Sequence, residues 1–599
     1  MDEEVQELHY SKPPMRREIL AAVGLFSGTA AVVAWQNSRL TVLYDLCGVL
    51  ENAHRISLGD VPYRDFPFPY APLTFLIQAL IIKITGAVYW HHILYCALVG
   101  GAATVVTWRI ILNLLRGRIP AAHLTAFLLS LPLMILGIYD IFPHPFYDPD
   151  AVFIILLALF LGQRLERKNF PVIKTLLVGM LLIVPLFSKQ NIGLAFLGAV
   201  MLSLAVLMAV NRRRNQSVKG YLILSAGAAA GLAIAAAIIH STAGLGNYWF
   251  WTMTYAQMRR TPSVNEMLSV YQDWSLFVWI PLMAIGAILF WRNRTAKSLL
   301  NVPAILLMSA PFIWTVVYLF INADNSERAE RLVGVFPLMF IVSGAAAILT
   351  LKHFKEINAT LPFILIATMH GVFLSQQLWG STYAVWSLLM ILTATLLPFL
   401  HRISNAESSN RLAVLAAIIS LSLLISGGFY VYSNERLDYV NFNDGALAHS
   451  KLPPLAGLSM RGSYISDFEE LVDYADKNIP FDDGILIIPG EDLFNYTTGR
   501  HPHFSVILFD ITNNPLSPEQ ILEQVKERDI RWLITKNDLE IEVDQTIDDR
   551  NRLLEVLKPE FKHAESLDNY EIFRRRTSAD ADDEDDADAD GEPESQTAP

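Results

Sequence analysis

The sequence predicts a polytopic α-helical membrane protein that ends in a C-terminal α/β domain, and three observations carry this prediction. The 599 residues are 53% hydrophobic and only 17% charged, whereas soluble domains carry about 25% charged residues. Apolar stretches long enough to cross about 30 Å of hydrocarbon recur between residues 19 and 432. Beyond residue 432, helical and strand patterns alternate, which is typical of a mixed sheet covered by helices.

Thirteen apolar stretches are predicted to span the membrane. They lie at 19–36, 92–115, 120–139, 151–163, 171–187, 192–210, 221–240, 275–291, 299–321, 332–350, 360–378, 381–399 and 412–432. A further apolar run at 71–86 is interrupted by Gln78 and Lys83. If it also spanned, the basic cluster at 212–214 would lie outside, against the positive-inside rule. We therefore expect 71–86 to be a juxtamembrane helix.

This orientation fixes the expected domains. Residues 1–18 form a cytoplasmic N-terminus, and 19–432 form the transmembrane domain with an extracytoplasmic loop at 37–91. Residues 433–577 form an extracytoplasmic α/β domain, in which 484–489 and 531–536 read as buried strands. Its helical segments are expected at 467–479, 517–529 and 547–557. The second of these opens with a Ser-x-x-Gln capping pattern.

The last residues, 578–599, have a different composition. Ten acidic side chains and no basic one fall between 580 and 599, so most of the net charge of −12 resides there and the remainder of the chain carries −2. Such a segment has too little apolar surface to fold, and we expect a disordered acidic tail.

Several function classes leave no trace in the sequence. Cys47 and Cys96 form neither a metal-ligand pattern nor a disulfide framework. There is no Walker A motif, no G-x-G-x-x-G after a strand, no zinc-binding spacing and nothing that indicates a nucleic-acid partner.

An acidic residue follows the first predicted span directly. Asp45 is placed where a carboxylate could remove a proton from a hydroxyl that arrives from outside, although an ordinary interfacial aspartate is the alternative. Fixed positions follow it: Gly48, Ala53, Gly59, Pro62-Tyr63-Arg64-Asp65-Phe66 and Tyr70-Ala71-Pro72-Leu73.

This run resembles the first extracytoplasmic loop of the GT-C superfamily of membrane glycosyltransferases, within it the bacterial protein O-mannosyltransferase and lipid A aminoarabinose transferase groups. The resemblance implies about 13 transmembrane helices, a catalytic carboxylate at Asp45 and a lipid-linked donor. Leu46 stands where many members have a second acid, and Tyr70-Ala71-Pro72 stands where the aminoarabinose branch has Lys-Pro-Pro. The donor sugar of that branch is therefore not carried over.

Three more residues of the first loop are candidates. Tyr63 and Arg64 could bind substrate, and Asp65 is a second carboxylate that could take part in catalysis. A structural role for Asp65, holding Arg64 or capping the following turn, is the alternative.

The second outer loop carries His144, Tyr147, Asp148 and Asp150. Asp148 before Pro149 fits a helix N-terminus, but this accounts for one acid of the group only. We expect a substrate-binding or catalytic role for at least one of them. Asp and His side chains can hold a divalent ion, so a metal stays open.

A phosphate-bearing donor also requires cations. The outer candidates are Lys189, Arg259, Arg328 and Arg331. The alternatives are a snorkelling Lys189, an interfacial amphipathic helix around Arg259 and a salt-bridged helix start at 326–331.

These residues predict a multi-pass cell-membrane glycosyltransferase. It would move a sugar from a polyprenyl-phosphate donor to a hydroxyl of a glycan, lipid or protein acceptor, with inversion and with Asp45 as general base. A transporter or flippase of lipid-linked sugars is one alternative, and it would require ionisable residues within the spans. A non-enzymatic envelope assembly factor that uses 433–577 for binding is the other.

Overall fold

A computed structural model describes residues 15–259, 263–292, 301–350, 356–374, 382–404, 410–437, 444–509, 513–542 and 544–576. The acidic tail and the first fourteen residues lie outside the described residues. Contacts divide the chain into a helical unit (Met1–Thr41, Phe68–Ile77 and Trp90–Asp438) and a sheet unit (Val42–Pro67, Gln78–Tyr89 and Tyr439–Pro599). Each unit is described by itself.

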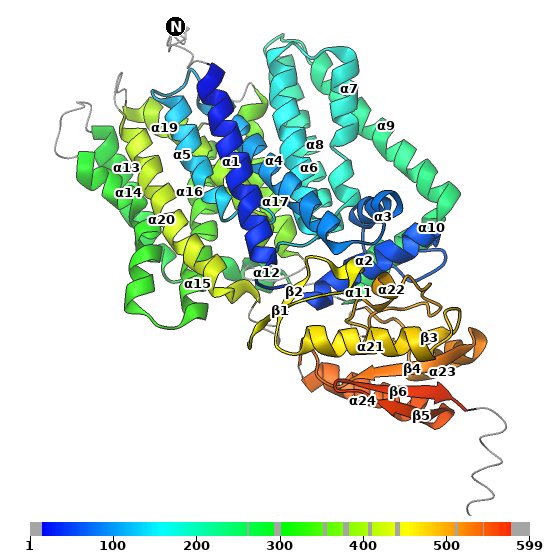
Figure 1. Ribbon diagram of the computed structural model, residues 1–599. Helices are drawn as coiled ribbons and strands as arrows, with labels where there is room; N and C mark the ends of the chain where they lie inside the picture. Colours follow the sequence, from blue (N-terminus) through cyan, green and yellow to red (C-terminus); the bar gives the residue numbers. More distant parts are fainter. Residues whose placement is uncertain are drawn as a thin grey trace, which may run out of the picture. The chain divides into compact units, whose positions relative to one another are not determined.

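The helical unit consists of helices joined by short connections (Figure 1). Its elements are α1 (Met15–Asn37), α4 (Tyr89–Leu115), α5 (Ala122–Ser130), η1 (Leu131–Met134), α6 (Tyr147–Arg167), α7 (Val172–Leu181), η2 (Val184–Phe187), α8 (Gln190–Arg213), α9 (Lys219–Thr242), α10 (Leu245–Trp249), η3 (Phe250–Tyr255), α11 (Ala256–Arg259), α12 (Val264–Leu268), η4 (Ser269–Tyr271), α13 (Leu276–Arg292), α14 (Asn301–Ile321), α15 (Asn325–Val333), α16 (Val335–Leu349), α17 (Ile357–Phe373), η6 (Thr382–Ala384), α19 (Trp386–Ser404), α20 (Arg411–Ser433) and η7 (Glu435–Leu437).

The described helices confirm a multi-pass membrane protein. Eight are long and apolar enough to cross a membrane, and nine if the bent pair Asn265–Tyr271 and Leu276–Arg292 is one span. Every one of the thirteen predicted stretches overlaps a helix. Some of these helices are shorter than a full span because α5 and α7 pass into 3₁₀ turns at Pro132 and Pro185.

Two glycines let two of these helices approach closely. α7 packs along α9 in Figure 1. A Cβ atom on Gly179 or on Gly227 would overlap the backbone of the facing helix. Small residues at such contacts are the usual basis of helix packing in membranes.

The run at 71–86 forms the short helix α3 (Leu73–Thr85) of 13 residues. At 1.5 Å per residue it is about 20 Å long, less than the hydrocarbon thickness. Its length agrees with the predicted non-spanning helix.

The sheet unit contains a four-stranded sheet in the order β3-β4-β6-β5 and a separate antiparallel pair, β1-β2. β3 and β4 are parallel, whereas β6 runs antiparallel to both of its neighbours. The elements are β1 (Leu447–His449), η9 (Pro453–Leu455), β2 (Ser459–Arg461), α21 (Tyr464–Asn478), β3 (Gly484–Ile488), α22 (Phe494–Thr498), α23 (Pro518–Glu527), β4 (Ile530–Lys536), α24 (Asp544–Leu557), η10 (Lys558–Glu560), β5 (Phe561–Ser566) and β6 (Tyr570–Arg575).

Helices cover both faces of this sheet. Apolar side chains of α23 and α24, such as Val525 and Leu557, pack with Leu533 of β4 in one buried core. On the opposite face, the ammonium of Lys536 lies 4.8 Å from the ring centroid of Tyr464 in α21. The predicted strands and helices of the α/β domain are thus present, and the Ser517 capping box is confirmed.

The sheet unit also includes α2 (Leu43–Leu58), which belongs to the first loop. From the sequence, this loop is expected to belong to the transmembrane domain. The contacts place α2 with the C-terminal domain because three buried polar side chains, Cys47, Glu51 and Arg55, find their partners there, about 450 residues later in the chain.

Candidate functional site

Two loops of the helical unit meet through an ion pair. α6 begins at Tyr147 and α8 begins just after Lys189. The Lys189 ammonium lies 3.1 Å from the Asp148 carboxylate, and the two side chains are 15% and 6% exposed. The Ser188 hydroxyl also donates to the Tyr147 carbonyl over 3.1 Å. The structure therefore brings together three predicted site residues, Tyr147, Asp148 and Lys189.

An aromatic surface adjoins this pair. The Lys189 ammonium lies 4.1 Å from the centroid of the Tyr147 ring, and Tyr147 stacks on Tyr70 with centroids 5.6 Å apart. Phe75 stacks on both tyrosines. Gln190 donates to the Pro69 carbonyl over 3.2 Å and holds the first-loop segment here. A cation above stacked rings, at the ends of apolar helices, can receive an anion whose remainder is apolar.

Asp150 is engaged within the protein. Its carboxylate accepts hydrogen bonds from the hydroxyls of Tyr95 (2.8 Å), Tyr139 (2.7 Å) and Thr74 (2.8 Å). It is 2% exposed. Three donors on one buried carboxylate favour a structural role, tying α3, α4 and α6 together.

His144 lies among aromatic rings. Its imidazole is buried, with a centroid 4.2 Å from that of Phe142. Phe142 also contacts Tyr383, and the Arg436 guanidinium lies 5.1 Å from the Tyr383 ring centroid. Arg436 follows the last long helix and is not among the candidates predicted from the sequence, although its guanidinium lies over the rings of Phe142 and Tyr383. Among the described residues, no group of three or more His, Cys, Asp or Glu side chains is arranged to hold a metal ion.

The basic residues of α15 differ from one another in their contacts. Arg328 donates to the Leu319 carbonyl over 2.8 Å and to Asn325, so it secures the start of this helix. Arg331 lies over the Tyr318 ring and lines a small pocket with Asp273, Glu330 and the indoles of Trp279 and Trp314. The side chain of Arg259 lies outside the described part of the chain.

Asp45 lies in the first turn of α2, in the sheet unit, and is half-buried. The carboxylate of Glu540, just after β4, accepts hydrogen bonds from the Leu43 and Tyr44 backbone N–H groups at 2.8 and 2.5 Å. Glu540 therefore caps α2 at the end where N–H groups lack intrahelical partners. The nearby Asp45 charge is one of the causes that raise the pKa of Glu540, after burial and Glu491.

A buried ion cluster supports Glu540. The Lys536 ammonium, 0% exposed, lies 2.7 Å from Glu491 and 3.0 Å from Asp492. Glu491 also accepts the backbone N–H of Glu540 over 2.8 Å. Burial alone lowers the pKa of Lys536, but Asp492 and Glu491 outweigh it, so the pKa is raised. The ammonium is therefore kept charged.

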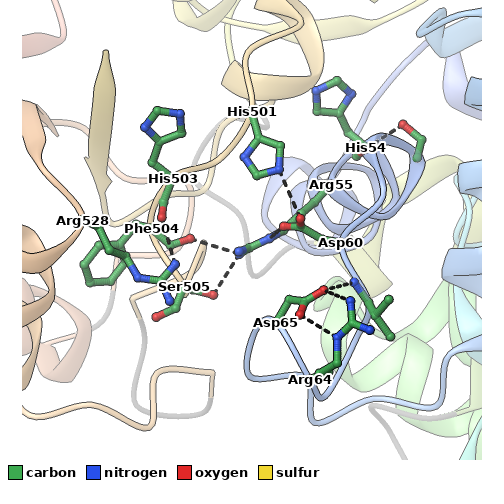
Figure 2. A network of polar contacts seen from close by, with 12 residues as sticks. His54, Arg55, Asp60, Arg64, Asp65, His501, His503, Phe504, Ser505 and Arg528 are labelled. Atoms are coloured by element: carbon green, nitrogen blue, oxygen red, sulfur yellow. Dashed lines mark hydrogen bonds and ion pairs between the residues drawn. The ribbon is translucent and has the colours of Figure 1, made fainter. Parts of the chain in front are cut away.

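Further polar contacts fix α2 along its length. The Cys47 thiol donates to the Gly490 and Asp492 carbonyls at 3.0 and 3.2 Å, and Glu51 accepts the Tyr496 N–H at 2.9 Å. Figure 2 shows Arg55 reaching Asp60 and the carbonyls of Phe504 and Ser505. The segment from Gly490 to Tyr496 therefore holds α2 through its backbone groups.

Asp65 holds Arg64, which is one of the two structural roles expected of it, but its other hydrogen bond reaches the preceding turn and not the following one. Its carboxylate accepts the Val61 N–H over 2.7 Å and pairs with Arg64 at 2.8 Å (Figure 2). The Arg64 side chain is 54% exposed. Tyr63 is buried and has a left-handed backbone, φ 70°, which is rare for an aromatic residue and marks a strained turn.

No protein-family model matches the sequence, and no curated protein matches it. Among solved structures, it is similar to ArnT from Cupriavidus metallidurans bound to undecaprenyl phosphate, with TM-score 0.43 and 11% identity over 94% of this chain and 98% of that one. It is also similar to ArnT from the same organism in the apo state, with TM-score 0.44 and 12% identity over 93% of this chain and 97% of that one. The oligosaccharyltransferase from Archaeoglobus fulgidus in the apo form is similar with TM-score 0.44 and 11% identity over 86% of this chain and 69% of that one.

Proposed function

We propose that this protein is a membrane glycosyltransferase that takes its sugar from a polyprenyl-phosphate donor and passes it to an acceptor hydroxyl. The observation that carries the proposal is the Lys189 ammonium, held by Asp148 above the stacked rings of Tyr147 and Tyr70. This arrangement suits a lipid phosphate, because a cation meets the anionic head and an apolar helix bundle meets the chain.

The base of the reaction is assigned to Asp45. Its support is the first-loop resemblance together with its position in the first turn of a capped helix, where the helix dipole favours a carboxylate. Asp45 accepts the proton of the acceptor hydroxyl while the hydroxyl oxygen bonds to the anomeric carbon.

The leaving group needs a cation more than an acid. As the new bond forms, the bond between the anomeric carbon and the phosphate oxygen breaks, and its electron pair leaves with the lipid phosphate. Lys189 stabilises this charge. A single displacement of this kind inverts the anomeric configuration. Asp148 keeps Lys189 in place through the 3.1 Å ion pair.

The test is turnover by the purified full-length protein reconstituted in sealed lipid vesicles, with a panel of radiolabelled polyprenyl-phosphate sugars and a total membrane extract as acceptor. The expected result is release of polyprenyl phosphate together with labelled product. Label that crosses vesicle membranes with the donor intact would instead identify a flippase. Donor binding without release or transport would identify a non-enzymatic factor.

A further inference from the structure

The first-loop helix and the C-terminal domain are joined at the point where Asp45 lies. Glu540 binds the first two N–H groups of α2, and Asp45 follows two residues after Leu43. All of these residues belong to the sheet unit. A helix N-terminus that is left uncapped frays, so a cap located there controls the position of Asp45.

The cap is built in and is not an accidental surface contact. Glu540 is 0% exposed, and it is itself held by Glu491, whose carboxylate accepts its N–H over 2.8 Å. Glu491 is in turn fixed by Lys536 at 2.7 Å. The relay thus runs from Lys536 in the sheet through Glu491 and Glu540 to the first turn of α2.

This set of charges is costly as a packing device. Burying several charges is weak evidence for stability, since apolar residues of similar size often stabilise a core as well or better. A buried carboxylate that accepts two backbone N–H groups does, however, determine where a helix begins, which an apolar side chain cannot do. Glu540 therefore contributes mainly by fixing where α2 begins.

We propose that Glu540 is a positioning residue for the transfer reaction, holding the Asp45 carboxylate in its productive place through the N-terminus of α2, with Lys536 and Glu491 as its support. This inference rests on the proposed function for its kinetic arm only.

Cys47 supplies a readout that does not depend on activity. Its buried thiol contacts Gly490 and Asp492 from the second turn of α2, and the sequence has only one other cysteine, Cys96. In a Cys96→Ser background, the rate at which a maleimide labels Cys47 reports how firmly α2 is held.

Three variants are compared in that background: Glu540→Ala, Glu540→Gln and, as a matched control, Glu523→Ala at an exposed position of α23. For Glu540→Ala we expect kcat to fall about 10- to 100-fold with KM within about twofold, because misplacing a reacting group affects chemistry more than substrate binding. Glu540→Gln keeps one carbonyl acceptor, so its kcat should lie between that of Glu540→Ala and that of the parent. Glu523→Ala should match the parent.

The rate of Cys47 labelling is expected to be highest in Glu540→Ala, intermediate in Glu540→Gln, and the same in Glu523→Ala as in the parent. If Cys47 is labelled at the parental rate in Glu540→Ala, Glu540 does not hold the N-terminus of α2, whatever the kinetics show. Faster labelling of Cys47 with an unchanged kcat would show that Glu540 caps α2 but does not position Asp45 for the reaction. If the parent protein transfers no sugar, the proposed function fails while the labelling arm still decides whether Glu540 holds α2. If Glu540→Ala does not fold, Glu540→Gln decides by the same two measurements.

Discussion

Lys189 and Asp148 form an ion pair of 3.1 Å whose members come from the starts of two different helices, α8 and α6. A pair with side chains 15% and 6% exposed is screened little by water. It fixes the ammonium group over the Tyr147 ring, whereas a merely snorkelling lysine would extend toward the interface. The contact therefore argues against a merely snorkelling lysine, and substitution tests the proposed functional role.

Lys189→Met should lower the rate of donor cleavage by about 100-fold, since a preorganised charge at a leaving group contributes about that much. It should also destabilise the protein by about 3–5 kcal/mol because Asp148 becomes a buried charge without its cation. The measurements are polyprenyl-phosphate release and the thermal midpoint in detergent.

The two effects of that change can be separated. The double variant Lys189→Met with Asp148→Asn removes the lone buried charge and should recover most of the thermal midpoint. Turnover should stay low. Recovery of turnover along with stability would show that Lys189 serves folding only.

Asp150→Ala should destabilise the helical unit without a specific kinetic signature. Three hydroxyls lose their acceptor, and a hydrogen bond to a charged group contributes about 1.5–3 kcal/mol. Asp150→Asn, which keeps an acceptor oxygen, should be milder. Thermal unfolding in detergent checks the order. A variant of wild-type stability with an altered KM for donor would instead make Asp150 a substrate ligand.

Glu51 makes the stability of the sheet unit depend on pH. Burial raises the pKa of this carboxyl to about 8, and the hydrogen bond from Tyr496 only partly opposes the shift. Because the folded pKa exceeds the unfolded value of 4.5, the stabilising contribution is complete below pH 4.5 and is lost as the pH rises through about 8. Glu51→Gln stays neutral and should flatten this decline, raising stability at pH 8 by a few kcal/mol at most. The free energy of unfolding is measured by urea unfolding, followed by tryptophan fluorescence, from pH 5 to pH 9. If it falls with pH equally steeply in the parent and in Glu51→Gln, the role of Glu51 is contradicted.

Asp65→Asn should leave kcat within about threefold of the parent and stability within about 1 kcal/mol. Its partner Arg64 is largely exposed, and exposed ion pairs contribute little. An asparagine keeps the acceptor for the Val61 N–H. Loss of turnover with an unchanged thermal midpoint would restore Asp65 to the catalytic residues.

Much of the fold could be predicted from the sequence because apolar length and loop charge act locally. The positive-inside argument left 71–86 out of the spans, and α3 is indeed only 13 residues long. The capping pattern at Ser517 marked a helix start for the same local reason. By contrast, Pro132 and Pro185 shorten α5 and α7 by turning them into 3₁₀ segments, which hydropathy does not register.

The polar contacts of the candidate site were harder to predict. Lys189 and Asp148 could be named as outer residues, but their pairing depends on how two loops pack. The cap on α2 comes from Glu540, almost 500 residues away, and no periodicity connects the two. Arg436 likewise reaches the His144 cluster from the far end of the last long helix. Long-range partners of this kind are set by tertiary packing alone.

The proposed mechanism depends most on the carboxylate of Asp45. Its most direct test is single-turnover cleavage of a radiolabelled polyprenyl-phosphate sugar by Asp45→Asn, with Asp65→Asn as the matched control. Asparagine keeps the size of the side chain and cannot accept the proton. We predict that Asp45→Asn inserts into membranes and binds donor like the parent while transfer falls below detection, and that Asp65→Asn transfers normally. Transfer by Asp45→Asn at the parental rate would contradict the role of Asp45 as general base.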